Sequence, residues 1–233
     1  MKIRADFSQR VVVRPGEADW APSPQPGVDR FMLDRIGEEI ARATSLVRFS
    51  PGSFFPFHEH GGGEEVFVVD GVFEDEYGRY PAGTYLRDPI GSSHAPFAKE
   101  GCTLFVKLWQ FAADDKERVV VDTASAAWKQ TATPSLVVKP LHSFARVSTS
   151  LVQMAPGLRL NRALDSGGEE ILVLEGAFAD GEGEYSKGAW IRDPGGRETA
   201  IVSQDGCALL VKTGHLPPDL GALQDFATAR PAR

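Results

Sequence analysis

The chain has 233 residues, with 25 lysines and arginines against 32 aspartates and glutamates and a formal net charge of −7. It contains no dense basic run, no apolar run of the ~18 residues that a membrane span needs, and no signal-peptide pattern among its first residues. These features predict a cytoplasmic protein that binds neither nucleic acid nor membranes and whose partner is a small molecule. Its only cysteines, Cys102 and Cys207, are too few for a disulfide framework or a cysteine zinc site, so any metal must be held by nitrogen and oxygen.

Short runs rich in β-forming residues follow one another along the chain. In the first half they cover residues 45–49, 65–73, 84–88 and 103–111. A polar, irregular segment follows over residues 112–135, and the second half has further runs at residues 149–154, 170–178, 189–193 and 208–213. Such runs between Gly and Pro turns are typical of an antiparallel sandwich or barrel. Only residues 219–229 show a weak helical pattern, so an all-β fold is predicted.

The chain repeats itself at a shift of 105 positions. Residues 51–107 align with residues 156–212 without a gap, and 23 of the 57 paired positions are identical. The matches include Gly and Pro residues at turns that need particular backbone dihedrals, so both halves share one backbone plan. We therefore predict two tandem domains, residues 1–115 and residues 116–233, with the boundary falling within residues 111–124.

Three histidines and a glutamate of the first half occur at a regular spacing. His58, His60 and Glu64 follow one another closely, and His94 comes shortly after a Pro-Ile-Gly turn. Side chains two apart on a strand point to the same face, so His58 and His60 project together. Three imidazoles and one carboxylate would form a site suited to zinc, iron, manganese, nickel or copper. Glu65 is the alternative to Glu64 as the carboxylate ligand.

This spacing resembles the two sequence motifs of the cupin superfamily, G-x5-H-x-H-x3,4-E-x6-G and G-x5-P-x-G-x2-H-x3-N. The first motif runs from Gly52 to Gly71, and the second begins at Gly83 and has Ala98 in place of the terminal asparagine, which is not a ligand in the family. The resemblance implies two double-stranded β-helix, or jelly-roll, barrels in tandem. It also implies a divalent metal on the three histidines and the glutamate of the first barrel.

Within the superfamily, the stretch from Trp20 to Phe111 is most similar to the cupin of ChrR-type anti-sigma factors. The residues that carry this resemblance are W-x-P-S-P-Q-P-G-V from Trp20, S-P-G-S before H-E-H, G-G-G-E-E-V after it, and L-R-D-P-I-G-S-S-H. In that family an amino-terminal zinc-binding helical domain with a His-x3-Cys-x2-Cys motif grips the sigma factor. No such motif occurs here, so direct binding of a sigma factor is not expected.

The second half has lost the three histidines. The shift of 105 positions places Ala163, Asp165 and Thr199 at their positions, whereas the glutamate is retained as Glu169. We expect a metal-free barrel, although an Asp165 and Glu169 pair that holds a hard cation weakly is an alternative. Arg159, Asn161, Arg162 and Arg197 lie near the lost site in the sequence, and are either solvated charges at its edge or an anion pocket.

Two classes of function are consistent with these residues. One is a non-haem metal-dependent dioxygenase of a small ketone or diketone, and the other is a sensor with a closed, structural zinc shell. Either would act on or sense a small molecule, an oxidised one included, through the first barrel. Phe54, Phe55, Phe57 and Tyr85 are candidates for an apolar mouth around the site, with core packing as the alternative. Cupin barrels commonly pair through an exposed sheet, so a homodimer is one arrangement and an internal pairing of the fused barrels is the other.

Overall fold

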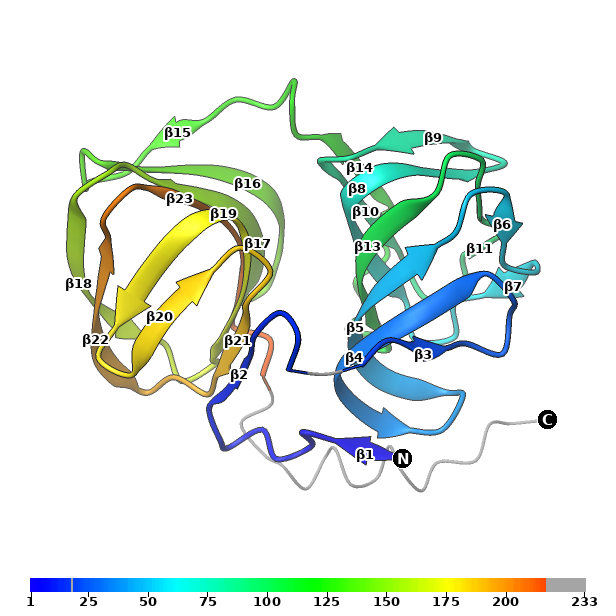
Figure 1. Ribbon diagram of the computed structural model, residues 1–233, viewed down its shortest axis with the longest axis horizontal. Helices are drawn as coiled ribbons and strands as arrows, with labels where there is room; N and C mark the ends of the chain where they lie inside the picture. The colour runs from blue at the N-terminus through cyan, green and yellow to red at the C-terminus, as the bar shows by residue number, and fades with distance from the viewer. Residues whose placement is uncertain (18, 217–233) are drawn as a thin grey trace. The chain divides into compact units, whose positions relative to one another are not determined.

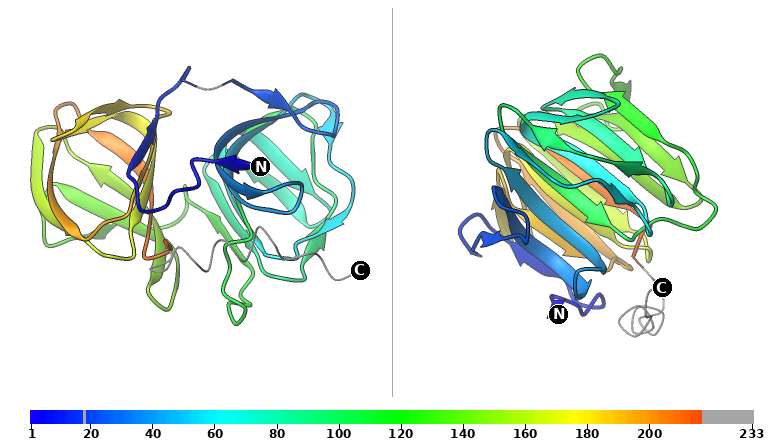
Figure 2. Two further views of the ribbon diagram at one scale, coloured as in Figure 1. Left: turned by 90° about the horizontal axis from the view of Figure 1, so that it is seen from below. Right: turned by 90° about the vertical axis from the view of Figure 1, so that its right-hand side faces the viewer.

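The computed structural model describes residues 1–17 and 19–216, and these residues form strands and connecting turns (Figure 1). They divide into two compact units, one containing residues 1–5 and 19–126 and the other containing residues 6–17 and 127–216. In each unit antiparallel strands curl into a barrel (Figure 2). The prediction of an all-β fold with two tandem cupin barrels is confirmed. Within the described residues there is no helix that could cross a membrane.

The first unit contains thirteen of the strands. They are β1 (Lys2–Ile3), β3 (Ala21–Pro22), β4 (Val28–Gly37), β5 (Ala41–Phe49), β6 (Ser53–Phe54), β7 (His58–Glu59), β8 (Glu64–Asp75), β9 (Gly78–Pro81), β10 (Thr84–Asp88), β11 (Ser93–His94), β12 (Phe97–Ala98), β13 (Cys102–Leu108) and β14 (Val119–Asp122). The main sheet has the order β1-β4-β5-β13-β8-β10-β14. The end of β8 turns away from this sheet to pair with β9 and β12, while β7 and β11 form a separate ribbon.

The second unit repeats this arrangement. Its strands are β2 (Val11–Val13), β15 (Lys129–Gln130), β16 (Leu136–Phe144), β17 (Val147–Met154), β18 (Leu158–Leu164), β19 (Glu169–Asp180), β20 (Gly183–Ser186), β21 (Trp190–Asp193), β22 (Arg197–Ser203) and β23 (Cys207–Thr213). The main sheet has the order β15-β16-β17-β23-β19-β21-β2. Strands β18 and β22 pair over seven residues, where the first unit has two short pairings, β6 with β12 and β7 with β11.

Two glycines explain why the long strands β8 and β19 can serve both sheets of their barrel. Gly71 and Gly176 lie in these strands with φ angles of +73° and +67°, in the left-handed region that favours glycine. A Cβ atom at Gly71 would lie 2.2 Å from the carbonyl oxygen of Gly101, and one at Gly176 would lie 2.1 Å from that of Gly206. Both strands also carry a register shift against their neighbour just before the glycine. The bend of each barrel wall therefore depends on a residue without a side chain.

Each barrel has its own apolar core. The first core contains Val66, Val68, Phe73, Leu86 and Leu104, among other residues. The second is built from residues at equivalent places on its strands, including Ile171, Val173, Phe178, Ile191 and Leu209. Alternation of apolar and polar residues on the strands directs these side chains inward.

One strand of each barrel comes from the segment that precedes the other repeat in the sequence. We call these two strands, β2 and β14, the exchanged strands. The sequence R-V-V-V occurs at residues 10–13 and again at residues 118–121. Strand β2, from the first copy, pairs with β21 of the second barrel, and β14, from the second copy, pairs with β10 of the first barrel (Figure 1). The two units are therefore not contiguous stretches of chain, whereas the predicted domains, residues 1–115 and 116–233, are contiguous.

The arginine ahead of each exchanged strand binds carboxylates of the barrel that it completes. The Arg10 guanidinium lies 2.6 Å from Asp180 and 3.1 Å from Asp193, and these two carboxylates are nearly fully buried. Arg118 donates to Asp88, the counterpart of Asp193, at 2.9 Å. Each exchanged strand thus carries both main-chain and ionic contacts to its barrel.

Most predicted strands occur where expected, and two predictions need correction. The run over residues 103–111 ends as a strand at Leu108, because Trp109 has a φ of +60° that a strand does not accommodate. The segment over residues 112–135, predicted to be irregular, contains the sheet strand β14, whose partner β10 is distant in the sequence. The weak helical pattern at residues 219–229 lies outside the described residues.

Candidate metal centre

The four side chains with ligand spacing lie on or next to three strands of the first barrel. His58 lies on β7 opposite His94 on β11, and Glu64 is the first residue of β8. His60 follows β7, where its backbone N–H donates to Ser92 at 2.8 Å and its carbonyl accepts from Gly91 at 3.0 Å. Main-chain hydrogen bonds thus fix both segments that carry histidines.

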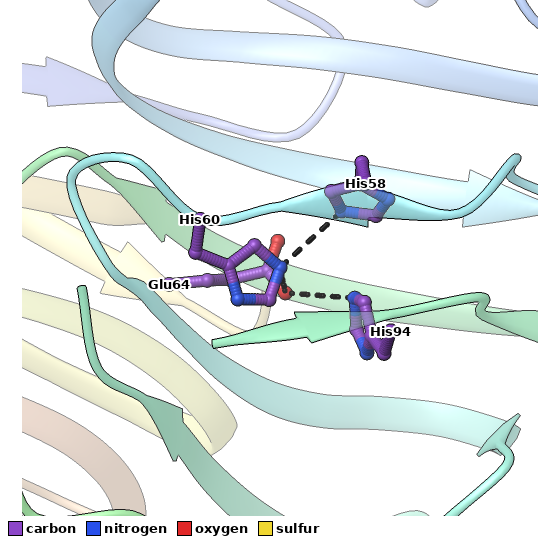
Figure 3. Close-up of side chains that lie close together, drawn as sticks. All are labelled: His58, His60, Glu64 and His94. Atoms are coloured by element: carbon purple, nitrogen blue, oxygen red, sulfur yellow. Dashed lines mark hydrogen bonds and ion pairs between the residues drawn. The ribbon is translucent and has the colours of Figure 1, made fainter. Parts of the chain in front are cut away.

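The donor atoms of these side chains converge on one point, as Figure 3 shows. Ligand atoms of His58, His60, Glu64 and His94 all lie within 4.8 Å of one another. The Nε2 atoms of His58 and His60 are 3.3 Å apart, and Oε2 of Glu64 lies 3.4 Å from Nε2 of His60 and 3.5 Å from Nε2 of His94. His60 and His94 are buried, whereas His58 is partly exposed.

Hydrogen bonds determine which ring nitrogen of His58 and His60 carries the proton. Nδ1 of His58 lies 2.9 Å from the carbonyl oxygen of Pro56, which can only accept, so this nitrogen carries the hydrogen. Nδ1 of His60 lies 3.0 Å from Oγ of Ser92, and that hydroxyl already donates to the carbonyl of Pro89 at 2.6 Å. The hydroxyl therefore accepts from His60. In both rings Nε2 has no hydrogen and presents a lone pair to the centre.

A buried carboxylate orients His94 in the same way. Nδ1 of His94 donates to Oδ2 of Asp75 at 3.3 Å. The other oxygen of Asp75 accepts from the backbone N–H groups of Tyr77 and Gly78 and from the hydroxyl of Tyr80, at 2.8 to 3.0 Å. Asp75 is thus held by three donors while it fixes the tautomer of His94.

The donor set fits a divalent cation. The Nε2 atoms of His58 and His60 lie 3.3 Å apart with no hydrogen between them and with the Glu64 carboxyl beside them, which is unfavourable unless a cation lies among these atoms. Nε2 of His94 is buried and has no hydrogen-bond partner in the structure. Zinc, iron, manganese, nickel and copper all accept imidazole and carboxylate ligands.

The environment of the centre shifts the pKa values of its groups in different directions. Burial, together with the nearby His94, lowers the pKa of His60 to about 4. Burial also lowers the pKa of His58 and raises that of the Glu64 carboxyl. Burial alone would lower the pKa of His94, but the hydrogen bond to Asp75 and the charge of Glu64 outweigh this effect and raise the pKa. His58 and His60 are therefore neutral near pH 7, the form in which imidazole binds metals.

The centre lies in the wall of a cavity of about 590 Å³ inside the first barrel. The four donor residues line this cavity together with mostly apolar side chains. These side chains include Val28, Val47, Phe49, Phe55, Val66, Phe73, Leu104, Val106, Leu108 and Trp109. A metal on the four side chains would therefore face an apolar space large enough for a small molecule.

The structure corrects the predicted apolar mouth. Phe55 lines the cavity, but Phe54 and Phe57 do not and are exposed to 54% and 67%. Tyr85 is buried at 1% exposure, and its hydroxyl donates to Glu65 at 2.8 Å. Glu65, the alternative ligand, therefore points away from the centre, since neighbouring residues on a strand face opposite sides. Sequence reasoning missed Asp75 and Trp109, although Asp75 recurs as Asp180 in the second repeat.

The second barrel has an ion pair where the first has its donor cluster. Arg162 donates from both terminal nitrogens to the two oxygens of Glu169, at 2.5 Å each. Arg197 pairs with Asp193 at 2.6 Å. Because these two guanidinium groups already bind carboxylates, they do not form an open anion pocket, and Glu169 is engaged by a cation of the chain itself. The cavity beside Glu169 and Thr199 measures only about 10 Å³.

Two tandem jelly-roll barrels with histidines on this spacing define a cupin of the two-barrel class. The sequence profile of the ChrR Cupin-like domain matches residues 8–112 and again residues 116–217. The chain therefore belongs to the ChrR cupin-like family. Among curated proteins none matches this chain.

Solved structures share the fold at low sequence identity. A Nostoc punctiforme protein with a provisional dioxygenase assignment is 14% identical, with a TM-score of 0.69 and coverage of 94% of this chain and 84% of that one. A provisionally assigned glyoxylate-induced protein from Pseudomonas aeruginosa is 13% identical, with a TM-score of 0.72 and coverage of 88% of each chain. A bacterial pirin from Escherichia coli in complex with nickel(II) is 14% identical, with a TM-score of 0.66 and coverage of 91% and 100%. At these identities the likeness concerns the fold.

Proposed function

We propose that the first barrel binds a divalent transition metal on His58, His60, Glu64 and His94 and uses it to act on a small, largely apolar molecule. The observation that carries this proposal is the position of the donor cluster in the wall of an apolar cavity of about 590 Å³. A structural zinc site is closed by four protein ligands, whereas a catalytic site keeps an open position for water or substrate. The cavity provides the space that an open position requires.

The residues of the barrel have separate tasks in this proposal. The three imidazoles and Glu64 hold the metal, and Asp75, Ser92 and the Pro56 carbonyl keep each Nε2 free to bind it. A bound metal would supply Lewis acidity and, as iron, redox chemistry with dioxygen. The apolar wall would bind the hydrocarbon part of a ketone or diketone and keep bulk water out.

Oxygen-dependent cleavage of a small ketone or diketone is the reaction class that this arrangement favours. Such a substrate offers oxygen donors to a metal and apolar groups to the cavity wall. The provisional assignment of the Nostoc neighbour as a dioxygenase agrees with this class, and the nickel(II) in the pirin neighbour agrees with a divalent metal in this fold.

Ligand sensing without turnover is the second candidate, favoured by the match to the ChrR Cupin-like domain. It would use the same cavity, and it differs from the enzyme in having no chemical step. A direct contact with a sigma factor is not part of either proposal.

Two measurements test the proposed function. The first is metal analysis of protein purified without added metal, where we expect about one metal ion per chain. The second is titration of the cobalt-substituted protein with acetylacetone, followed by an oxygen-consumption assay of the iron-loaded protein. An open site predicts a change in the cobalt absorption spectrum, since added oxygen donors change the coordination. A spectrum unchanged by every small ligand would contradict the open site, and binding without oxygen uptake would favour the sensor.

A further inference from the structure

Trp109 adopts a backbone conformation that its side chain disfavours. It follows β13 with a φ of +60°, in the left-handed region where a bulky side chain is an outlier. The shift of 105 positions places Gly214 at the same point of the second barrel, and Gly214 has a φ of +75°. The backbone plan thus calls for glycine here, and the barrel with the donor cluster has tryptophan instead.

The surroundings of the indole hold it in place over the turn that joins two of the donor residues. A Cβ atom on Gly62 would lie 2.2 Å from Cδ2 of Trp109, and one on Gly61 would lie 3.0 Å from its Cζ2. The backbone N–H of Trp109 donates to the Gly63 carbonyl at 3.1 Å. At the position of Gly61 the second barrel has Ser166. The glycines between His60 and Glu64 therefore make room for this indole.

Strained residues persist where the surroundings over-determine them, and they cluster at ligand and active sites. Trp109 lines the same cavity as His60 and Glu64. The second barrel, with glycine at this point, keeps a cavity of only about 10 Å³ beside its own glutamate, Glu169. The first barrel thus combines tryptophan at this position with a large cavity beside its donor cluster, whereas the second barrel has glycine at this position and little free space beside Glu169.

We propose that Trp109 determines substrate specificity by presenting its indole to a planar aromatic group of the substrate. The substrate class is then an aromatic ketone or 1,3-diketone whose oxygen atoms reach the His58, His60, Glu64 and His94 centre. Aromatic rings gain from stacked or edge-to-face contact beyond the area that they bury. This inference rests on the proposed function, because it needs a metal and a ligand in the cavity.

The experiment compares two probes that differ in one group. Acetylacetone and benzoylacetone present the same pair of oxygens, but benzoylacetone carries a phenyl in place of a methyl. The dissociation constants are measured from the absorption of cobalt-substituted protein for the wild type and Trp109→Gly, with cobalt affinity measured alongside. We expect the wild type to prefer benzoylacetone, and Trp109→Gly to lose roughly 3- to 10-fold of that preference while its affinity for cobalt and acetylacetone changes little.

Controls separate this role from a structural one. Phe54→Ala removes an exposed aromatic ring outside the cavity and should leave the preference unchanged. Trp109→Phe should retain part of the preference, and Trp109→Asn, a residue that tolerates positive φ, repeats the test if the glycine variant does not fold. An unchanged preference in Trp109→Gly or Trp109→Asn would overturn the role of Trp109. A wild-type protein that does not bind cobalt, or that binds cobalt but neither diketone, would instead overturn the proposed function and this inference with it.

Discussion

At the scale of single residues, only one histidine of the centre has its Nδ1 proton held by a charged group. His58 donates to a carbonyl and His60 to a hydroxyl, whereas His94 donates to the carboxylate of Asp75. A carboxylate increases the basicity of the imidazole as well as fixing its tautomer. His94 therefore depends more strongly on its partner than the other two ligand candidates do.

Replacement of Asp75 by Asn should weaken metal binding without abolishing it. The amide can donate to Nδ1 of His94, which would move the ring proton to Nε2 and compete with the metal. We expect the dissociation constant for zinc to rise about 10- to 100-fold, measured by competition with a chromophoric chelator. Asp180→Asn is the matched control, because Asp180 binds Arg10 and Tyr185 in the second barrel. Equal metal affinity in the two variants would contradict the role of Asp75.

The second barrel supplies substitutions that remove the candidate ligands within the same backbone plan. His58→Ala and His94→Thr introduce the residues that stand at the equivalent positions, Ala163 and Thr199. We expect metal content to fall from about one ion per chain to nearly none, with a far-ultraviolet circular dichroism spectrum like that of the metal-free wild type. Full metal occupancy in both variants would show that these histidines are not ligands.

Metal affinity should fall with pH in a way that reflects the different pKa values of the ligands. The pKa values of His94 and Glu64 are both raised, so protons compete with the metal at these two groups as the pH falls. His60, with a pKa of about 4, competes only in stronger acid. Between pH 7 and pH 5 we expect log Kd to rise by roughly one to two units per pH unit. Isothermal titrations at several pH values measure this slope, and a flat profile would contradict histidine ligation.

At the scale of strands, sequence patterns predict those strands whose formation depends on residues that are close together in the sequence. The strands β5, β8, β10 and β13 and their counterparts could be predicted because each is a run of β-forming residues between turns. Strand β14 was missed because its few apolar residues lie in a polar segment and their partner, β10, is far away in the sequence. The donor cluster could be predicted because its motif has fixed spacing. Trp109 could not, because nothing in the residue type predicts a positive φ.

The arginine that precedes each exchanged strand gives a prediction at this scale. Arg10 is 15% exposed and binds the buried carboxylates of Asp180 and Asp193, so Arg10→Ala leaves buried charges with fewer partners. We expect a loss of about 3 kcal/mol in the stability of the second barrel. Arg118→Ala removes a side chain that is 41% exposed, and its cost should be nearer ~1 kcal/mol.

Calorimetry on the two arginine variants measures these effects in the intact chain. The transition of the second barrel should shift in Arg10→Ala, and metal content of the first barrel should stay the same. If both variants melt like the wild type, the ion pairs of the exchanged strands do not contribute to stability.

At the scale of the whole molecule, the exchange of strands decides which fragments can fold. A fragment of residues 19–126 includes β14, whereas one of residues 19–115 ends before it and leaves the outer edge of β10 unpaired. Unpaired sheet edges promote aggregation. We expect the longer fragment to give a dispersed amide spectrum and to bind about one metal ion, and the shorter one to be less stable and to aggregate. Equal behaviour of the two would mean that β14 is dispensable.

The exchanged strands also set the order in which a nascent chain can complete its barrels. Ribosomes add about 5 to 20 residues per second, and domains generally fold as their last element emerges. The first barrel cannot close until β14, at residues 119–122, has left the exit tunnel, by which time synthesis of the second repeat is under way. The second barrel joins β2, one of the earliest segments made, to strands that run as far as residue 213. The Val11–Val13 segment therefore stays unpaired through most of translation, because its partner strand β21 is among the last parts of the chain to be synthesised.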